Sequence, residues 1–355
     1  MIRVMIDSGN TTDRTGTGIH VATLLAGLRT YAADRVETLE SGISLPSRHA
    51  RPVRRLGYLW RLRQLAAAGY HGADVVHFIN VFVPARHRRA KYAVTIHDLD
   101  PLLYPGTYTR RYVFYFGHAI GLALKRADRI VTMTEAVRES ILERHSIPPE
   151  RIVACGTGVS PAFARAADEE PAPPAPETPF VLFVGTLTRK KNVAWAVRTV
   201  AEGVRRGALP RLRLVLAGNP GFGFGEIQEA LREAGDTVVW VRNPDLPALI
   251  RLYKSSSAVI LPSRCEGYGL PLVEGMYCDK PVVASRISTS LEVAADAAEY
   301  FALDNAEELY EAVRTAIRTA DDPQRRAARR ARLDHYSWKR LAGGYATMYE
   351  GAFRA

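Results

Sequence analysis

Residues 179–206, PFVLFVGTLTRKKNVAWAVRTVAEGVRR, show in one stretch how this chain is built. The run 180–184 is apolar on both faces, which is typical of a strand buried in a parallel sheet. A short polar turn follows, and residues 192–206 then repeat apolar positions at the helical period. A strand, a turn and a helix in this order predict one unit of an α/β fold.

The same alternation runs along both halves of the chain. Further strands are expected at 2–7, 74–79, 92–98, 129–134, 151–155, 212–218, 237–241, 257–263 and 281–285. Further helices are expected at 19–31, 110–126, 135–145, 226–234, 245–255 and 306–320. Repeated βα units imply parallel sheets covered by helices, so the fold class is α/β, with two Rossmann-like domains facing a central cleft. Ligands of such folds bind beyond the carboxyl ends of the strands.

A composition break separates the halves. Residues 166–179, AADEEPAPPAPETP, are acidic, contain five prolines and have no apolar side chain larger than alanine, so we expect a semi-rigid linker. The length of 355 residues also exceeds the roughly 250–300 at which a single core stops growing. We therefore predict domains at 1–165 and 180–336, followed by a C-terminal segment at 337–355.

The composition excludes several classes of protein. Hydrophobic residues make up 47% and charged residues 24%, which rules out a largely disordered or fibrous chain. No apolar stretch approaches 18 residues, and Asp7 comes too early for a signal peptide. Three cysteines without a CxxC spacing suggest neither a disulfide framework nor zinc. We expect a cytoplasmic protein.

The positive charge is concentrated in the first half. Residues 1–165 contain 23 Lys/Arg against 13 Asp/Glu, whereas residues 166–355 contain 25 against 24. This half is expected to meet an anionic partner, although an Arg-rich and Ala-rich composition alone could give the same excess. Residues 48–69 combine six arginines with Leu and Trp, which suits either a helix at an anionic membrane surface or a core helix with a solvated basic face. Arg86, Arg88, Arg89 and Lys91 form a second basic cluster.

Two loops are candidates for binding phosphate. In SGNTTDRTGTGIH, residues 8–20, Gly16 and Gly18 are expected to precede a helix whose N-terminus can bind an anion. A glycine turn without a ligand is the alternative. After the strand at 180–185, the turn with Arg189, Lys190 and Lys191 could neutralise a diphosphate, or could be a solvated basic turn.

A third candidate follows the strand at 92–98. His97 and Asp98 lie at its carboxyl end, where site residues of an open α/β sheet gather. A structural histidine bonded to the backbone is the alternative. Asp98-Leu99-Asp100 also matches a D-x-D metal motif, but Pro101 follows at once, and we expect no metal there.

The most specific element is LPSRCEGYGLPLVEGM, residues 261–276. Gly267, Gly269 and Pro271 predict a turn with free backbone amides followed by a helix, with Glu274 in its first turn. Glu274 can accept hydrogen bonds from a ribose diol, Glu266 can contact a sugar hydroxyl, and the helix N-terminus can support the phosphate between them. Two unrelated carboxylates flanking a turn are the alternative.

With these motifs the sequence resembles glycosyltransferase family 4, the retaining nucleotide-sugar transferases of the GT-B fold. Its E-x7-E signature is matched by Glu266-GYGLPLV-Glu274, and the glycine loop, HDLDPLLYP (97–105), VGTLTRKKN (184–192), PVVAS (281–285) and YSW (336–338) with Tyr345 and Tyr349 also fit. The resemblance spans nearly the whole chain. It implies that the last helix, 337–353, crosses back to the first domain.

The resemblance also implies roles for the candidate residues. Lys191 is the phosphate-binding lysine, and either Arg189 or Lys190 takes the role of the family's arginine. Glu274 holds the ribose, Glu266 the donor sugar, and His97 lies near the reacting carbon. The nucleotide base is expected beside Arg242 and Asn243. The full set of expected donor-binding residues is Gly16, Gly18, Gly185, Arg189, Lys190, Arg242, Asn243, Leu249, Gly267, Tyr268, Gly269, Leu270 and Glu274, with His97, Lys191 and Glu266 as catalytic residues.

These roles imply a retaining, metal-independent hexosyltransferase with no cofactor besides its donor. The style of the motifs resembles mannosyltransferases, so GDP-mannose is the first expected donor and a UDP-sugar the second. A glycan, a lipid-linked glycan or a natural product is the expected acceptor. A nucleotide-sugar epimerase or hydrolase of the same fold is one alternative, and a phosphate- or nucleic-acid-binding protein is another. Aromatic residues do not alternate with basic ones as in nucleic-acid modules, so no nucleic-acid partner is expected.

Overall fold

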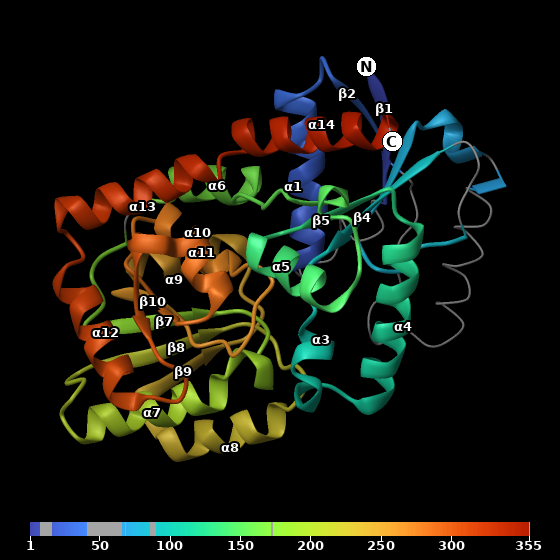
Figure 1. Cartoon of the computed structure of the whole chain (residues 1–355). Coiled ribbons are helices and arrows are strands. Elements are labelled where there is room, and N and C mark those ends of the chain that lie inside the picture. The colour runs from blue at the N-terminus through green and yellow to red at the C-terminus, as the bar shows by residue number, and fades with distance from the viewer. Residues whose placement is uncertain (8–15, 41–65, 68, 86–89, 172, 355) are drawn as a thin grey trace. The chain divides into compact units, whose positions relative to one another are not determined.

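The computed structural model describes residues 1–7, 16–40, 66–67, 69–85, 90–171 and 173–354 (Figure 1). It divides into two compact units. Unit 1 comprises Met1–Leu103, Arg110–Ser160 and Tyr336–Ala355, and unit 2 comprises Tyr104–Thr109 and Pro161–His335. The glycine loop at 8–15, nearly all of the basic segment 48–69 and the cluster residues Arg86, Arg88 and Arg89 lie outside the described residues.

Unit 1 is built on a six-stranded parallel sheet in the order β2-β1-β3-β4-β5-β6. The chain leaves β1 in one direction to form β2 and in the other to form β3, so the order reverses between β1 and β3. The strands are β1 (Ile2–Ile6), β2 (Val36–Glu40), β3 (Val75–Phe78), β4 (Lys91–Ile96), β5 (Arg129–Thr132) and β6 (Ile152–Ala154).

The helices of unit 1 bury apolar faces against this sheet. They are α1 (Gly16–Tyr31), α3 (Asp100–Leu103), α4 (Arg110–Arg126), α5 (Glu135–Arg144) and α14 (Trp338–Arg354). One core contains Val94 and Ile96 of β4 with Ile120 and Leu124 of α4. The expectation that Gly16 and Gly18 precede α1 is wrong, because the helix begins at Gly16 and both glycines lie in its first turn.

The C-terminal helix α14 packs on unit 1, as the family resemblance implied. A Cβ on Gly27 of α1 would lie 2.3 Å from Cε3 of Trp338, so the glycine lets the two helices come close. The Trp338 indole donates to the Val159 carbonyl at 3.1 Å, and Arg35 pairs with Glu350 at 2.9 Å. Figure 1 shows α14 at the end of the chain that is coloured red.

Unit 2 holds the second parallel sheet, in the order β12-β11-β10-β7-β8-β9. The strands are β7 (Phe180–Val184), β8 (Arg213–Ala217), β9 (Val238–Val241), β10 (Ala258–Leu261), β11 (Val282–Ser285) and β12 (Ala298–Phe301). Read from β9, this is the doubly wound nucleotide-binding order. Strands β8 and β9 are added on one side of β7, and β10 to β12 are added on the other side, so the strand order reverses between β7 and β10. The two parallel sheets with their helices confirm the expected α/β class.

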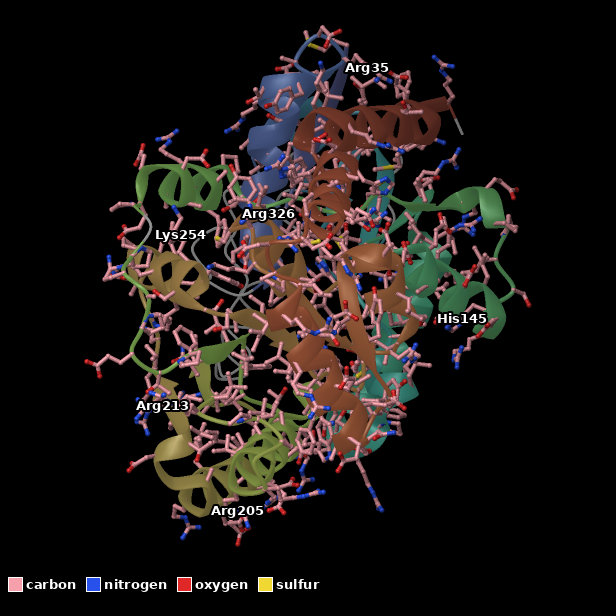
Figure 2. All side chains as sticks on the ribbon, turned by 90° about the vertical axis from the view of Figure 1, so that its left-hand side faces the viewer. Arg35, His145, Arg205, Arg213, Lys254 and Arg326 are labelled. Carbon is pink, nitrogen blue, oxygen red and sulfur yellow. The ribbon has the colours of Figure 1, made fainter. Side chains whose placement is uncertain are left out.

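The helices of unit 2 are α6 (Pro161–Glu169), α7 (Val193–Arg205), α8 (Phe224–Ala234), α9 (Leu246–Ser255), α10 (Leu270–Tyr277), α11 (Ser288–Ala294), α12 (Ala306–Arg318) and α13 (Pro323–His335). The segment expected to be a linker begins inside α6, where Ala167 is buried. A core joins Val197 and Val200 of α7 to Leu214 and Leu216 of β8. Charged side chains such as Arg205 and Arg213 project from the surface of this unit (Figure 2).

Candidate active site

The candidate site of unit 2 lies at the point where the strand order reverses. Strands β7 and β10 are neighbours, so the loops that follow them lie side by side beyond the carboxyl edge of the sheet. The Arg264 amide donates to the Lys190 carbonyl at 2.8 Å, which fixes one loop against the other. The basic turn Arg189–Lys191 is a single 3-10 turn before α7, and Asn192 closes it in the left-handed conformation with a φ of 54°. The sheet order therefore places the basic turn beside the first glutamate of the signature.

The half-buried Lys191 and the buried Glu266 form an ion pair at this position. The Lys191 ammonium donates to Oε1 of Glu266, and the side chains are 17% and 6% exposed. The Ser263 hydroxyl donates to the same oxygen at 2.6 Å. Burial by itself raises the pKa of Glu266, but Lys191, Lys190 and these hydrogen bonds hold the pKa below its usual value. Glu266 is therefore a carboxylate, and the cation beside it is placed where a diphosphate can compete for it.

The structure gives Arg189 and Lys190 different surroundings. Arg189 pairs with Glu226 of α8 at 3.2 Å, and its stem packs where a Cβ on Gly223 would lie, 2.6 Å from Cγ. Lys190 instead acts electrostatically on Glu266 and lowers the pKa of that carboxyl group. Of the two residues, Lys190 is therefore the one whose charge reaches the site.

The turn between the two signature glutamates leads into α10. Gly269 precedes this helix with a φ of 99°, and a Cβ there would meet Leu261 at 3.2 Å, so glycine fits both the conformation and the space. Tyr268 is buried, and the Thr289 hydroxyl holds the Glu266 carbonyl at 2.8 Å. Because α10 begins at Leu270, Glu274 lies one residue beyond the first turn, not within it as expected.

Glu274 is a buried carboxyl group with one strong partner. The Tyr253 hydroxyl of α9 donates to its Oε2 at 2.6 Å. Burial raises the pKa of Glu274 to about 7, although the hydrogen bond from Tyr253 opposes the shift. Such a group changes between an acceptor-only carboxylate and a neutral acid near neutral pH.

The residues expected near the base lie at the ends of β8 and β9. Arg242 stacks its guanidinium 3.9 Å above the Trp240 ring, and Asn243, with a φ of 42°, accepts from the Asn219 amide at 3.3 Å. Leu249 is half-buried on α9. Gly185, which follows β7, has a φ of 142°, and its carbonyl would lie 2.1 Å from a Cβ on Gly218. These loops are packed backbone against backbone.

His97 belongs to unit 1, after β4. Its Nε2 lies 3.0 Å from the Ile79 carbonyl, so the ring is held by the backbone, and burial lowers its pKa. His20 of α1 meets it edge-on, with ring centroids 5.5 Å apart. His77 of β3 bonds the Tyr349 hydroxyl at 2.7 Å and the Thr95 hydroxyl at 2.8 Å. Two buried histidines, His20 and His77, thus lie with the half-buried His97 near this strand end, and these two were not predicted.

Of the aspartates of the D-x-D match, Asp98 bonds the local backbone. Asp98 accepts from the Asp100 amide at 3.3 Å, and Asp100 is buried at the start of α3. Among the residues that the structure describes, His, Cys, Asp and Glu form no group of three or more that could hold a metal ion. In the same part of the chain, no helix has the length and hydropathy needed to span a bilayer.

The unpredicted partners share one feature. Ser263, Thr289 and Tyr253 each act through a side-chain hydroxyl, Ser263 from the same loop as Glu266 and the other two from α11 and α9, and hydroxyl residues are too common in sequence to signal a site. Arg264 is bidentate to Asp304 at 2.8 and 2.9 Å, which connects the β10 loop to the segment before α12. Only the three-dimensional arrangement identifies these supports.

Comparison with known protein families gives two adjoining matches. Residues 9–163 match the model described as Glycosyltransferase Family 4, and residues 165–334 match the model described as Glycosyl transferases group 1. O-antigen chain mannosyltransferase B of Escherichia coli is 28% identical over 255 residues, which cover 67% of this chain and 62% of that protein. D-inositol 3-phosphate glycosyltransferase of Acidothermus cellulolyticus is 32% identical over 175 residues, which cover 45% and 39%. The matches therefore span less than two thirds of these relatives.

Solved structures share the fold over the whole length. Sucrose-phosphate synthase from Thermosynechococcus elongatus has a TM-score of 0.71 at 20% identity, covering 100% of both chains. The Anabaena protein HepE in complex with UDP-glucose has a TM-score of 0.67 at 15% identity, covering 99% of both.

Proposed function

The chain is a member of the family 4-like glycosyltransferases with the GT-B fold, and on that premise we propose that it transfers a hexosyl group from a nucleoside-diphosphate sugar to an acceptor hydroxyl, with retention of anomeric configuration. The observation that carries this proposal is the Lys191–Glu266 pair at the reversal point of a nucleotide-binding sheet. A half-buried cation beside an ionised carboxylate offers one charge to a diphosphate and one acceptor to a sugar hydroxyl.

The proposed mechanism depends on stabilising the leaving diphosphate. In same-face transfer, the C1–O bond to the β-phosphate breaks, the acceptor oxygen bonds to C1 from that face, and the departing phosphate takes the acceptor's proton. Negative charge then develops on the β-phosphate, where Lys191, Lys190 and the N-terminus of α10 supply positive potential. Glu274 is proposed to accept from the ribose diol, and His97 to lie near the reacting carbon.

For the donor we propose GDP-mannose first and a UDP-sugar second. The names of the O-antigen mannosyltransferases support the first choice, and the UDP-glucose complex of HepE supports the second. The acceptor is proposed to be a glycan, a lipid-linked glycan or a small hydroxylated molecule. These relatives are named for O-antigen chains and for inositol phosphate, both of which are hydroxyl-rich acceptors.

The test is donor turnover with and without acceptors. Purified protein is incubated with GDP-mannose, UDP-glucose or UDP-galactose, and nucleotide release is followed with inositol 3-phosphate, a set of glycosides and a lipid-linked glycan. Acceptor-dependent release that disappears in Lys191→Ala supports the proposal. Release that no acceptor accelerates identifies a hydrolase, and interconversion of the donor sugar identifies an epimerase.

A further inference from the structure

Helix α6 is the first element of unit 2 after the chain leaves unit 1 at Ser160. It packs on α9, and its sequence, PAFARAADE, contains a single large apolar side chain, that of Phe163. Phe163 is 2% exposed, so nearly its whole ring is buried in unit 2. The docking of α6 therefore depends on what this ring meets.

The Phe163 ring lies against two tyrosines. Tyr253, in the last turn of α9, meets it edge-on with ring centroids 5.6 Å apart and planes at 79°. Tyr277, the last residue of α10, meets it in the same way at 6.2 Å. Edge-to-face contacts are favourable and fix the mutual orientation of the rings. Because Tyr253 is fully buried, its ring is positioned by such neighbours and not by solvent.

Polar contacts hold α6 in place beside the aromatic cluster. The Tyr277 hydroxyl lies 3.2 Å from both carboxylate oxygens of Asp168 on α6. Just beyond the helix, the Glu170 carbonyl accepts from the ammonium of Lys254, which Figure 2 labels on α9. These contacts come from α9 and α10, the two helices that the Phe163 ring also meets. The position of the ring is thus fixed by more than its own packing.

Tyr253 connects this packing to the second glutamate of the signature. Its hydroxyl donates to Oε2 of Glu274 at 2.6 Å. A hydrogen bond weakens steeply when its distance or angle departs from the optimum, so a small tilt of the tyrosine ring would reduce it. The contacts therefore run from Phe163 on α6, through Tyr253 on α9, to Glu274 on α10.

We propose that Phe163 is a positioning residue for the nucleotide site, because its ring holds Tyr253 at the angle at which the tyrosine hydroxyl donates to Glu274. The inference rests on the proposed function, in which Glu274 accepts from the ribose diol. Phe163 has no contact with the nucleotide in this proposal and acts only through Tyr253. Without the ring, Glu274 loses part of its hydrogen bond and keeps its proton to higher pH.

The other ionisable groups around Glu274 do not titrate near pH 7. Burial raises the pKa of the Tyr253 hydroxyl well above its ordinary value, and it raises the pKa of the Cys278 thiol, one turn further along α10, to about 12. Both groups are therefore neutral where Glu274 changes its charge. The charged side chains that act on Cys278 are those of Lys254, Lys280 and Asp168.

The first experiment reads Glu274 in the absence of nucleotide. The infrared absorbance of its protonated carboxyl group, identified by its loss in Glu274→Gln, gives the titration midpoint. Phe163→Leu keeps an apolar side chain and removes the ring. It is expected to raise the midpoint by about half to one pH unit, the scale of one hydrogen bond. An unmoved midpoint overturns the proposal, and so does a lower one, which would show that the lost ring had kept water from the carboxylate.

A double-mutant cycle tests the route through Tyr253. Tyr253→Phe keeps the ring and removes the hydroxyl, so the hydrogen bond to Glu274 is absent in this background. Phe163→Leu should then leave the midpoint where Tyr253→Phe has placed it, because residues that act through one interaction are not additive. Additive shifts would show that Phe163 acts on Glu274 without Tyr253, and would overturn the positioning role.

Calorimetric titration with GDP and with UDP separates this inference from the proposed function. A midpoint that rises from about 7 leaves less carboxylate, so Phe163→Leu should bind nucleotide about two- to fivefold more weakly at pH 7. Its affinity should approach that of the parent chain near about pH 9, where the carboxylate forms in both proteins. An equal loss at both pH values overturns the proposal. If the parent chain binds neither nucleotide, the proposed function fails, whereas the infrared midpoints still decide whether Phe163 positions Tyr253.

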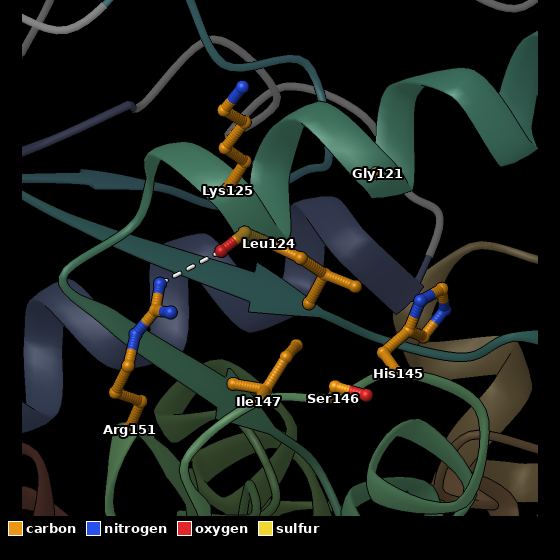
Figure 3. Close-up of a pocket in the computed structure, with 7 residues that line it drawn as sticks. All are labelled: Gly121, Leu124, Lys125, His145, Ser146, Ile147 and Arg151. Carbon is orange, nitrogen blue, oxygen red and sulfur yellow. Dashed lines mark hydrogen bonds between the residues drawn. The ribbon is translucent and has the colours of Figure 1, made fainter.

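Leu124→Ala is the control for a general loss of stability. Leu124 is 5% exposed, belongs to unit 1 and lines a pocket there together with Ile147 (Figure 3). Its truncation removes buried apolar surface and should destabilise the protein. The midpoint of Glu274 should nevertheless stay at the parent value. A shift as large as that of Phe163→Leu would show that any loss of core packing moves the midpoint, and would overturn the assignment to Phe163.

Discussion

Lys191 and Glu266 illustrate how far single residues can be predicted. The E-x7-E spacing and the lysine were visible in the sequence because each motif is local. The contact between them joins residues 75 positions apart and depends on β7 lying next to β10. The role of Arg189 could not be separated from that of Lys190 in advance, because the separation comes from Glu226 and Gly223 on another segment.

Substitution of Lys191 should therefore affect catalysis most. Lys191→Ala is expected to lower kcat by about a hundredfold or more, the scale of losing one preorganised charge at the developing anion. Arg189→Ala should stay close to the parent enzyme, because that guanidinium is already paired with Glu226. Steady-state kinetics with varied donor measures both. An Arg189→Ala defect as large as that of Lys191→Ala would contradict the assignment.

The raised pKa of Glu274 predicts a pH dependence of nucleotide binding. Only the carboxylate accepts from both ribose hydroxyls, so affinity should rise as the pH increases through about 7. Glu274→Gln should weaken binding and remove this pH dependence. Tyr253→Phe removes the hydrogen bond that lowers the pKa, so its midpoint should move to higher pH. Calorimetric titration with GDP across this range tests all three proteins, and an unmoved midpoint in Tyr253→Phe would refute the coupling.

The same shift has a consequence for stability. The folded protein keeps the proton on Glu274 up to about pH 7, whereas the unfolded chain releases it near the ordinary value of 4.5. Between these values the native state binds more protons, so this group's contribution to stability decreases as the pH rises. A carboxyl group that destabilises the empty site at neutral pH is consistent with a binding role.

Among the elements that the structure describes, the strands that the sequence did not predict lie at the sheet edges. The unpredicted strands are β2, VETLE, and β12, AEYF, and each is the outermost strand of its sheet. An edge strand has one neighbour and alternates polar with apolar residues, so it lacks the continuous apolar run that revealed β7. Helix α13 was not predicted for a related reason. Its one buried residue is Arg329, which pairs with Asp279 at 3.0 Å, so the helix has no apolar stripe that the sequence could show.

The packing of α14 gives a test at this scale. Gly27→Ala should destabilise the protein by about 1–3 kcal/mol, because the added methyl group overlaps the Trp338 ring. Gly344→Ala is the matched control: it lies exposed in α14 with no heavy atom within 4 Å of its Cβ, and should stabilise by up to about 1 kcal/mol. Denaturant unfolding compares them. Changes of the same sign would argue against the close approach of the two helices.

At the scale of the whole molecule, charge separates the halves of the chain. The excess of 23 Lys/Arg over 13 Asp/Glu lies in residues 1–165, whereas the half that contains the candidate donor residues is nearly balanced. If the proposed site is right, a diphosphate is held there by a few placed cations and a helix N-terminus and not by a general positive field.

Activity without a divalent ion tests whether side-chain cations are enough to neutralise the leaving diphosphate. Transfer should persist in excess EDTA, because we propose that Lys191 and Lys190 neutralise the diphosphate as a metal would. Initial rates are compared before and after chelation. Loss of activity that magnesium or manganese restores would show that side-chain cations are not sufficient.

Nucleotide binding should also raise the stability of the protein, which identifies the base without knowledge of the acceptor. A ligand at about a hundred times its dissociation constant stabilises the native state by roughly 2.7 kcal/mol. GDP is expected to raise Tm more than UDP or dTDP, since GDP-mannose is the proposed donor. Lys191→Ala should reduce the shift, because it removes the half-buried cation that we propose binds the β-phosphate. A larger shift with UDP would transfer the donor assignment to the UDP-sugars, and equal shifts with all three would show that the loop after β9, with Arg242 and Asn243, does not discriminate between bases.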